Sequence, residues 1–343
     1  MRSRVYLDWN ATTPLRDEAR AAMVAAMDVV GNPSSVHAEG RAARALMERA
    51  RAQVAAAVGC KPAEVVFTSG ATEAAAVLGR LPVGRVEVEP TAHDCLWAQR
   101  RTGEGVRALG WGYANNETGV IAEPPARDDG AALMLDIVQA VGKVPFSFAW
   151  SGAEMAVVSA HKFGGPKGVG ALIVRDGFDV APALMGGGQE MGRRAGTENI
   201  IGIAGMGAAA EAAQRDLAAG RWEEVGELRN ILESALSSGA NNTISVGNGG
   251  LRLPNTLCLI APGWKGETQV MAMDLAGFAV SAGSACSSGK VRASRVLLAM
   301  GFDEVQAAQA IRVSLGPGVT KEEVLRFADV WCAQYRKALS RAA

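Results

Sequence analysis

The sequence lacks a net charge, because 35 lysines and arginines balance 35 aspartates and glutamates. A chain with no overall field exerts no general attraction on nucleic acid or on an anionic membrane surface. The sequence also lacks an uninterrupted apolar run of about 18 residues, which argues against a transmembrane helix. Residues 1–8 contain no apolar run of signal-peptide length. We therefore expect neither nucleic acid nor a membrane as a partner.

Cysteine and histidine motifs are missing as well. The five cysteines are widely spaced and form no Cys-x-x-Cys pair, and the three histidines match no zinc motif. We expect neither a disulfide framework nor a resident metal, and we expect most cysteines to be small buried side chains. Free thiols are typical of a reducing cytoplasm. Because aromatic residues make up only 5% of a chain that is 49% hydrophobic, we predict a tightly packed core of small side chains.

Short apolar runs alternate with segments of helical periodicity, which predicts an α/β fold with a mostly parallel sheet. We expect strands at 65–68, 85–88, 106–109, 133–136, 156–159, 171–174, 256–260, 279–282 and 311–315. We expect helices near 16–30, 36–58, 198–237, 268–277, 294–300 and 320–341. The Gly- and Asn-rich stretch 238–250 indicates a boundary. We therefore predict a large domain over 12–240 and a small α/β domain formed by 1–11 and 241–343.

Three polar segments follow predicted strands of the large domain. At 69–72 the sequence Ser-Gly-Ala-Thr precedes a helix and suits either a phosphate cradle or an ordinary N-cap. Asp136 suits either a cofactor ligand or a helix cap. Lys162 ends a buried strand beside glycines and a histidine, which favours a Schiff-base lysine over a surface lysine in a flexible loop. Because ligands bind at the carboxyl ends of strands in such sheets, we expect a binding site here.

Three more residues are candidates for chemistry. Cys286 lies in 281–289, a run of small polar residues that predicts a mobile loop with a reactive thiol, although an incidental loop thiol remains the alternative. Arg312 alternates with apolar residues on a predicted strand, so its partner is either a substrate carboxylate or an internal acid. His93 lies at the start of a predicted helix, where a capping or surface histidine is the commoner outcome.

The order of these and further motifs resembles the class V aminotransferase superfamily, and within it most closely the cysteine desulfurases of NifS/IscS type. The resemblance runs from residue 6 to about residue 316, and 281–286 points to the group with a long cysteine loop. The motifs that carry it are 6–14 (YLDWNATTP), 31–35 (GNPSS), 67–73 (FTSGATE), 115–119 (NNETG), Asp136-x-x-Gln139, Ser159-x-His161-Lys162, 194–197 (RAGT), 281–286 (SAGSAC) and 311–316 (IRVSLG).

The resemblance implies a pyridoxal-phosphate enzyme of fold type I with a mostly parallel, seven-stranded-type sheet. The large domain would bind the cofactor and the small domain would carry the cysteine loop. Lys162 would hold the cofactor, Asp136 would pair with its ring nitrogen and Gln139 would bind its ring hydroxyl. His93 would stack on the ring and take part in proton transfer.

The resemblance assigns the phosphate and the substrate to other residues. The phosphate group would be held by Ala71, Thr72, Ser159 and His161, joined by Thr197 from the partner subunit of a homodimer. Asn116 and Arg312 would bind the substrate carboxylate.

The implied reaction is the removal of sulfur from L-cysteine. Lys162 would take the α-proton, the Cys286 thiolate would receive the sulfur as a persulfide, and L-alanine would be released. The implied partners are L-cysteine and a sulfur-acceptor or iron–sulfur scaffold protein, with Cys286 as a transient ligand of an iron–sulfur cluster. The alternatives are another class V enzyme, such as a selenocysteine lyase or an aminotransferase, and a degenerate non-catalytic paralogue. The loop thiol disfavours an aminotransferase, and the retained motif residues disfavour the paralogue.

The chain is also shorter than the family usually is, in three places. The shortenings follow Glu73, lie between His93 and Asn116, and lie between Gly119 and Asp136. The family has another strand and helix in the second of these places. We expect the core sheet to lose its periphery there and still position the motifs.

Overall fold

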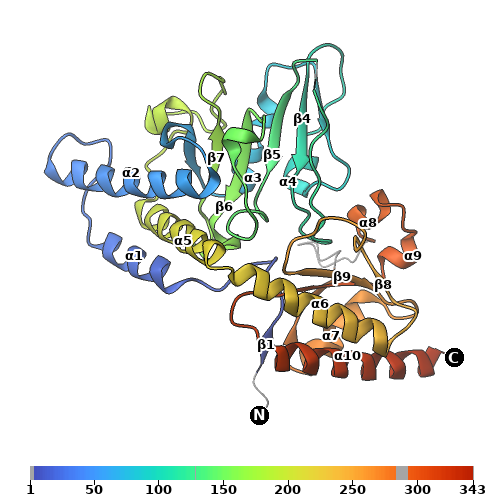
Figure 1. Cartoon of the computed structure of the whole chain (residues 1–343). Coiled ribbons are helices and arrows are strands. Elements are labelled where there is room, and N and C mark those ends of the chain that lie inside the picture. Colours follow the sequence, from blue (N-terminus) through green and yellow to red (C-terminus); the bar gives the residue numbers. More distant parts are fainter. Residues whose placement is uncertain (1–3, 128, 283–292, 343) are drawn as a thin grey trace. The chain divides into compact units, whose positions relative to one another are not determined.

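The computed structural model describes residues 4–127, 129–282 and 293–342 (Figure 1). These residues form two compact units. The large unit contains Thr13–Tyr113 and Glu123–Ala219, and the small unit contains the chain up to Thr12, Ala114–Ala122 and the chain from Gly220 onward. Cys286 lies outside the described residues. No helix among the described residues is both long and apolar enough to cross a membrane.

The large unit is built on one sheet with the strand order β2-β7-β6-β5-β4-β3. Its strands are β2 (Val65–Thr68), β3 (Arg85–Val88), β4 (Arg107–Gly112), β5 (Ala132–Asp136), β6 (Met155–Ser159) and β7 (Gly170–Val174). Strands β3 to β6 pair in parallel, whereas β7 runs antiparallel to both of its neighbours. Strand β2 therefore runs in the same direction as β6. The carboxyl ends of β2, β5 and β6 consequently lie at the same edge of the sheet.

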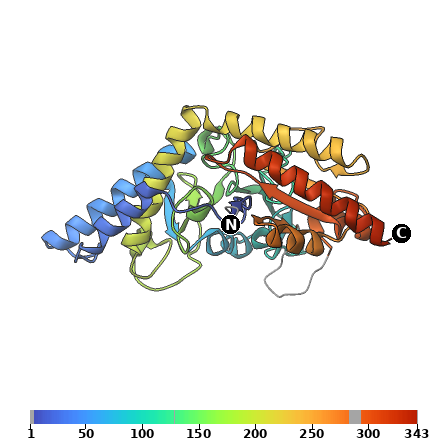
Figure 2. The same ribbon diagram turned by 90° about the horizontal axis from the view of Figure 1, so that it is seen from below.

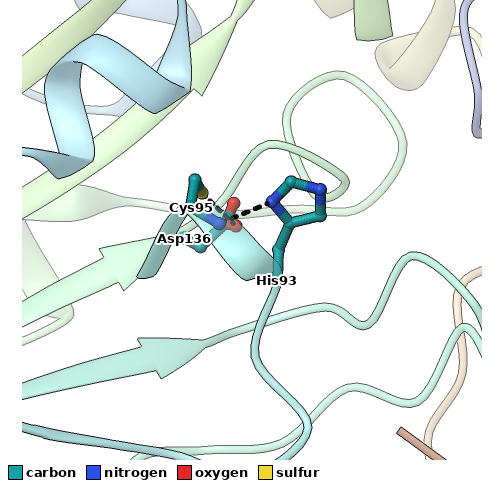
Figure 3. A group of neighbouring side chains, drawn as sticks. All are labelled: His93, Cys95 and Asp136. Atoms are coloured by element: carbon teal, nitrogen blue, oxygen red, sulfur yellow. Dashed lines mark hydrogen bonds between the residues drawn. The ribbon is translucent and has the colours of Figure 1, made fainter. Parts of the chain in front are cut away.

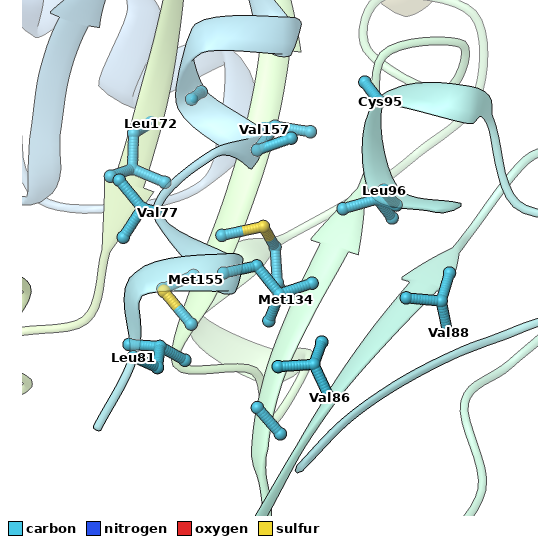
Figure 4. Close-up of a cluster of buried hydrophobic side chains, with 14 of the residues drawn as sticks. Val77, Leu81, Val86, Val88, Cys95, Leu96, Met134, Met155, Val157 and Leu172 are labelled. Carbon is cyan, nitrogen blue, oxygen red and sulfur yellow. The ribbon is translucent and has the colours of Figure 1, made fainter. Parts of the chain in front are cut away.

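Buried apolar side chains fix the sheet of the large unit in place. Figure 4 shows Met134 of β5, Met155 of β6 and Val86 of β3 within one cluster that also contains Leu96. Leu96 belongs to the short helix α4 (Asp94–Trp97), and α3 (Ala71–Ala75) contributes two alanines to the same cluster. Truncation of a side chain as buried as Met134 costs about 2–5 kcal/mol in typical cores. The strand ends are thus attached to a rigid platform.

Three longer helices of the large unit pack through small side chains. They are α1 (Asp17–Met27), α2 (Ala38–Val58) and α5 (Ile200–Ala218), and α5 contacts both of the others. A Cβ atom on Gly207 of α5 would lie 2.7 Å from the Cα atom of Ala50 on α2. Because real Cβ atoms do not approach so closely, a glycine is needed at this crossing. The core of small residues predicted from the sequence is confirmed here.

The small unit has its own antiparallel sheet, in the order β11-β12-β9-β8. These strands are β8 (Ile244–Ser245), β9 (Thr256–Ile260), β11 (Ser281–Ala282) and β12 (Ala310–Ser314), while β1 (Val5–Tyr6) pairs with β10 (Phe278–Ala279). The helices are α6 (Arg221–Gly239), α7 (Gly266–Leu275), α8 (Arg295–Ala299), α9 (Glu304–Ala307) and α10 (Lys321–Ala342). Figure 2 shows α6 and α10 side by side, in agreement with their contacts.

The structure confirms the α/β class with a mostly parallel sheet, and three details differ from the predictions. The predicted helix over 198–237 is two helices, because Gly220 adopts a left-handed conformation with φ of 74° between α5 and α6. The described sheet has six strands instead of seven, because the connection from α4 to β4 covers only 98–106 and is too short for another strand and helix. The unit boundary lies near 220 instead of 240, since α6 packs on α10.

Candidate active site

Asp136 ends β5, a strand of apolar residues, and is buried with 8% of its surface exposed. Its Oδ1 atom accepts the backbone N–H of Val138 at 3.0 Å, so the carboxylate caps the turn that follows the strand. Burial raises the pKa of Asp136, while the neighbouring His93 and Lys162 act in the opposite direction. A cation placed against this carboxylate would lower its pKa and keep it ionised.

Lys162 follows the neighbouring strand β6 and closes a single 3₁₀ turn, Ala160–Lys162. The side chain is half-buried. His161 in the same turn has its pKa lowered to about 4, chiefly by burial and further by the positive charges of Lys162, Lys167 and Lys143. The imidazole of His161 is therefore neutral at physiological pH. Since β5 and β6 pair in parallel, Asp136 and Lys162 lie at the same edge of the sheet.

His93, Cys95 and Asp136 form a cluster whose potential ligand atoms lie within 4.8 Å of one another (Figure 3). The Nδ1 atom of His93 accepts the N–H of Cys95 at 3.2 Å, so His93 caps α4 as well as facing Asp136. The thiol of Cys95 lies 4.0 Å from Oδ2 of Asp136. Burial, followed by the charge of Asp136, raises the pKa of this thiol. Cys95 is thus a protonated donor next to the carboxylate.

Gln139 follows Asp136 by one turn and is buried, with 3% of its surface exposed. Its Oε1 atom accepts a hydrogen bond from Nζ of Lys143 at 2.6 Å. Lys143 itself is almost completely buried, with 1% exposed. The sequence motifs had assigned a role to Gln139 and none to Lys143.

Small and hydroxyl-bearing residues stand at the same edge of the sheet. Ser159 ends β6 and is buried, while Ala71 and Thr72 open α3 directly after β2. The N-cap of α3 is Gly70, which makes no side-chain cap hydrogen bond, and the Glu73 side chain accepts the Ser69 N–H at 2.8 Å. Backbone and hydroxyl groups of this kind bind phosphate readily.

Thr197 lies near the end of β2 in the large unit. It lines a hollow of about 160 Å³ together with Thr68, Ser69 and Arg194. Arg194 pairs with Glu73 at 2.9 Å, which joins this segment to α3. No contact brings Thr197 to Lys162 among the interactions that we find in the described residues.

A buried ion pair holds the segment that precedes Thr197. Arg51 binds Glu190 through two hydrogen bonds of 2.7 and 2.8 Å, and their side chains are 4% and 0% exposed. Glu190 also accepts the N–H of Phe67 at 2.8 Å. Glu190 and Met191 have left-handed φ angles of 48° and 58°, a conformation that costs free energy in residues other than glycine. The ion pair offsets this cost and fixes the path of the chain.

Arg312 belongs to the small unit, in the centre of β12, and is buried with 6% exposed. Its Nη2 atom donates to Oδ1 of Asp8 at 2.7 Å, and its Nη1 atom donates to the carbonyl of Asn116 at 3.1 Å. Its Nε atom has no hydrogen-bond partner among the described residues. Of the two alternatives left by the sequence, the internal salt bridge is present. The contact with Asn116 uses its backbone and not its side chain.

These groups match the chemistry that pyridoxal phosphate requires. A buried carboxylate suits the ring nitrogen, an amine suits the aldehyde and an amide donor suits the ring oxygen. The large unit supplies all three at the carboxyl ends of adjacent strands, as Asp136, Lys162 and Gln139. Burial raises the pKa of Asp136, and a cationic ring nitrogen next to the carboxylate would lower that pKa again.

This fold and this set of groups define a pyridoxal-phosphate-dependent enzyme. The chain belongs to the aminotransferase class-V family, whose model matches residues 5–82 and 99–327. It is 39% identical to a cysteine desulfurase of Klebsiella pneumoniae over 94% of this chain and 90% of that protein. A NifS-like protein from Rickettsia africae has a TM-score of 0.86 and 28% identity, covering 98% and 99% of the two chains. SspA in complex with cysteine has a TM-score of 0.72 and 26% identity, covering 91% and 99%.

The comparisons confirm the family resemblance and the cofactor class. The roles assigned to single residues remain predictions, including that of Cys286, which lies outside the described residues. Three side chains that contact the assigned ones were given no role from the sequence: Cys95, Lys143 and Asp8. Lys143 carried one local signal, because it stands four residues after Gln139, a spacing at which side chains meet on one turn.

Proposed function

We propose that this protein is a cysteine desulfurase, which converts L-cysteine to L-alanine and leaves the sulfur as a persulfide on Cys286. One observation carries the proposal. Asp136 and Lys162 end neighbouring strands of one sheet, in a chain that is 39% identical to a cysteine desulfurase over nearly its whole length. The similarity to SspA, solved with cysteine, supports the same substrate.

The large unit would hold the cofactor with its own side chains. Lys162 binds the aldehyde carbon, Asp136 keeps the ring nitrogen protonated and Gln139 donates to the ring oxygen. His93, whose ring is exposed, stacks on the ring face. The phosphate group is held by Ala71, Thr72, Ser159 and His161, with Thr197 supplied by the partner subunit.

When bound, the cofactor takes up the electron pair left at the substrate α-carbon. Lys162 accepts the α-proton, and His93 moves a proton at the substrate sulfur. The thiolate of Cys286 then attacks that sulfur, so one S–S bond forms while the substrate C–S bond breaks. The products are L-alanine, after reprotonation, and a persulfide on Cys286, so no outside oxidant or reductant is consumed.

The substrate carboxylate is assigned to Arg312 and Asn116 of the small unit. Arg312 binds Asp8 through Nη2 and the Asn116 carbonyl through Nη1, and its Nε atom has no hydrogen-bond partner among the described residues. A guanidinium held by one edge still presents donors in a fixed plane, which is the geometry that a carboxylate recognises. The Asp8 salt bridge and substrate binding are therefore compatible roles of one side chain.

The remaining parts of the proposal concern the cellular setting. We infer a homodimer, because the family resemblance assigns Thr197 to the cofactor phosphate bound by a second copy. We infer a reducing cytoplasm, because Cys60, Cys95, Cys258 and Cys332 are all free thiols. The sulfur would pass from Cys286 to an acceptor, with an iron–sulfur scaffold protein as the first to test.

The test is the release of alanine and sulfide from L-cysteine by the cofactor-loaded protein, with the dithiol dithiothreitol added to reduce the persulfide on Cys286 and free its outer sulfur as sulfide. Cys286→Ala should keep the visible absorbance of the cofactor and lose sulfide release. Cys60→Ala is the matched control and should behave as wild type, since burial raises the pKa of Cys60 to about 12 and keeps that thiol protonated. Sulfide release by Cys286→Ala at the wild-type rate would refute the assigned thiol. The absence of alanine from the wild type would refute the function.

A further inference from the structure

Lys143 is a buried charge for which the proposed reaction has no use. Its side chain is 1% exposed, which is rare for a lysine because an ammonium group loses its hydration on burial. It lies in the turn after β5, where the N–H of Lys143 bonds to the carbonyl of Ala140 at 3.0 Å.

The ammonium group of Lys143 contacts the side chain of Gln139. An ammonium group only donates hydrogen bonds, so the Gln139 atom at 2.6 Å from Nζ has to be the carbonyl oxygen Oε1. The orientation of an amide is often ambiguous, but a donor-only neighbour settles it. The amide nitrogen Nε2 is consequently the branch turned away from Lys143, and it carries two donor hydrogens.

The same turn holds the other group that faces the cofactor. Asp136 is fixed by the N–H of Val138, and Gln139 is fixed by Lys143. Each of the two side chains therefore has one polar atom bound within the turn. Preorganised donors of this kind need no rearrangement when a ligand arrives.

We propose that Lys143 is a positioning residue, which holds Gln139 so that its amide N–H donates to the ring oxygen of pyridoxal phosphate. The inference rests on the role proposed for Gln139 above. Without Lys143 the amide can rotate and present Oε1, an acceptor, to an oxygen that carries negative charge. The donor to the ring oxygen would then be lost for part of the time.

The consequence is measurable in the absorbance of the cofactor. A hydrogen bond to the ring oxygen withdraws negative charge from that oxygen. The oxygen then attracts less strongly the proton that it shares with the nitrogen of Lys162. Loss of the donor strengthens that attraction, so the pH midpoint of the visible absorbance should rise by about 0.5–1 unit. A merely structural lysine would change the stability of the fold and leave this midpoint in place.

The experiment compares pH titrations of the visible absorbance for the holoenzyme and four variants. Gln139→Ala removes the donor, and Lys143→Met fills the same space without a hydrogen bond; Lys143→Leu serves where methionine is not tolerated. The double variant completes the cycle. Lys167→Met is the control, because Lys167 also lowers the pKa of His161 but is exposed. Cofactor dissociation constants give a second readout.

The expected result is an equal rise of the pH midpoint in Gln139→Ala, in Lys143→Met and in the double variant. The midpoint of Lys167→Met should not change. A wild-type midpoint in Lys143→Met together with a raised one in Gln139→Ala would overturn the inference alone. Equal shifts in Lys143→Met and Lys167→Met would overturn it in favour of a general charge effect. An unchanged midpoint in Gln139→Ala would overturn the role proposed for Gln139, and the inference with it.

Discussion

The two units hold their charged groups in different ways. In the large unit, Asp136 is bound to Val138, and Gln139 is bound to Lys143, so each contact spans only two to four positions. In the small unit, Arg312 is bound to Asp8 across 304 positions. The cofactor-facing groups are thus ordered by their own turn, whereas the carboxylate-binding arginine depends on the N-terminal segment being in place.

The path of the N-terminal segment explains how Asp8 reaches Arg312. Strand β1 pairs with β10, and Asp8 forms a bridge with Ser314 at the end of β12. Asp8 also accepts a hydrogen bond from Ser281 at 2.8 Å. A substitution in the N-terminal segment should therefore change substrate binding, while a substitution in the turn after β5 should change the cofactor.

The largest effect should come from Lys162→Ala, which removes both the cofactor linkage and the proton acceptor. We expect alanine release from L-cysteine to fall about 10⁴-fold, with loss of the visible absorbance of the linked cofactor. Lys167→Ala, five residues further along the chain, should retain both. Equal losses in the two variants would contradict the assignment of the cofactor linkage to Lys162 alone.

A second test sharpens the comparison, because the large unit also contains long-range ion pairs, of which Arg51 with Glu190 is the most buried. Glu190→Gln leaves the buried Arg51 with only the half-exposed Glu48 as a charge partner and should lower the free energy of unfolding by about 3 kcal/mol. Glu48→Gln is the matched control, since Glu48 binds the same arginine with a side chain that is 48% exposed. Its cost should stay below about 0.5 kcal/mol in urea titrations. Equal costs would show that burial does not set the strength of the pair.

A third test concerns the arginine of the small unit. Arg312→Met should raise KM for L-cysteine about 100-fold, because a charge-assisted contact to the carboxylate is lost. Asp8→Asn should raise it about 10-fold by loosening the guanidinium. Steady-state kinetics measure both, and the visible absorbance should be unchanged in each. A wild-type KM in Asp8→Asn would break the link between the N-terminal segment and the substrate.

The smallest effect is a pH dependence at His161. Its folded pKa is lowered to about 4, whereas an unfolded histidine has a pKa of about 6.5. Between these values the unfolded chain binds a proton that the folded chain does not, so stability falls as the pH decreases. His161→Gln should lose less stability than wild type between about pH 7 and about pH 5, as urea midpoints would show. An identical loss in both proteins would contradict the lowered pKa.

The sequence predicted the parts of the site that depend on local pattern. Asp136 and Lys162 follow apolar runs, so both the strands and the residues at their ends could be placed. The break between α5 and α6 was missed because helical periodicity continues on both sides of Gly220, and a glycine inside a helix gives no firm sign of a left-handed turn.

Contacts between distant segments could not be predicted in this way. The sequence left two possible partners for Arg312, an internal acid and a substrate carboxylate, because nothing near Arg312 in the sequence indicates Asp8. The proximity of Cys95 to Asp136 depends on α4 packing on β4, the strand next to β5, and the ion pair of Glu190 depends on α2. Such pairs are set by tertiary packing and leave no periodic trace in the sequence.

The most direct test of the account is to find which lysine carries the cofactor. The protein loaded with pyridoxal phosphate would be reduced with borohydride, which makes a Schiff-base linkage permanent, and its peptides would be mapped by mass spectrometry. The account predicts a single pyridoxyl label on Lys162. A label on Lys143 or Lys167, or no label at all, would contradict it.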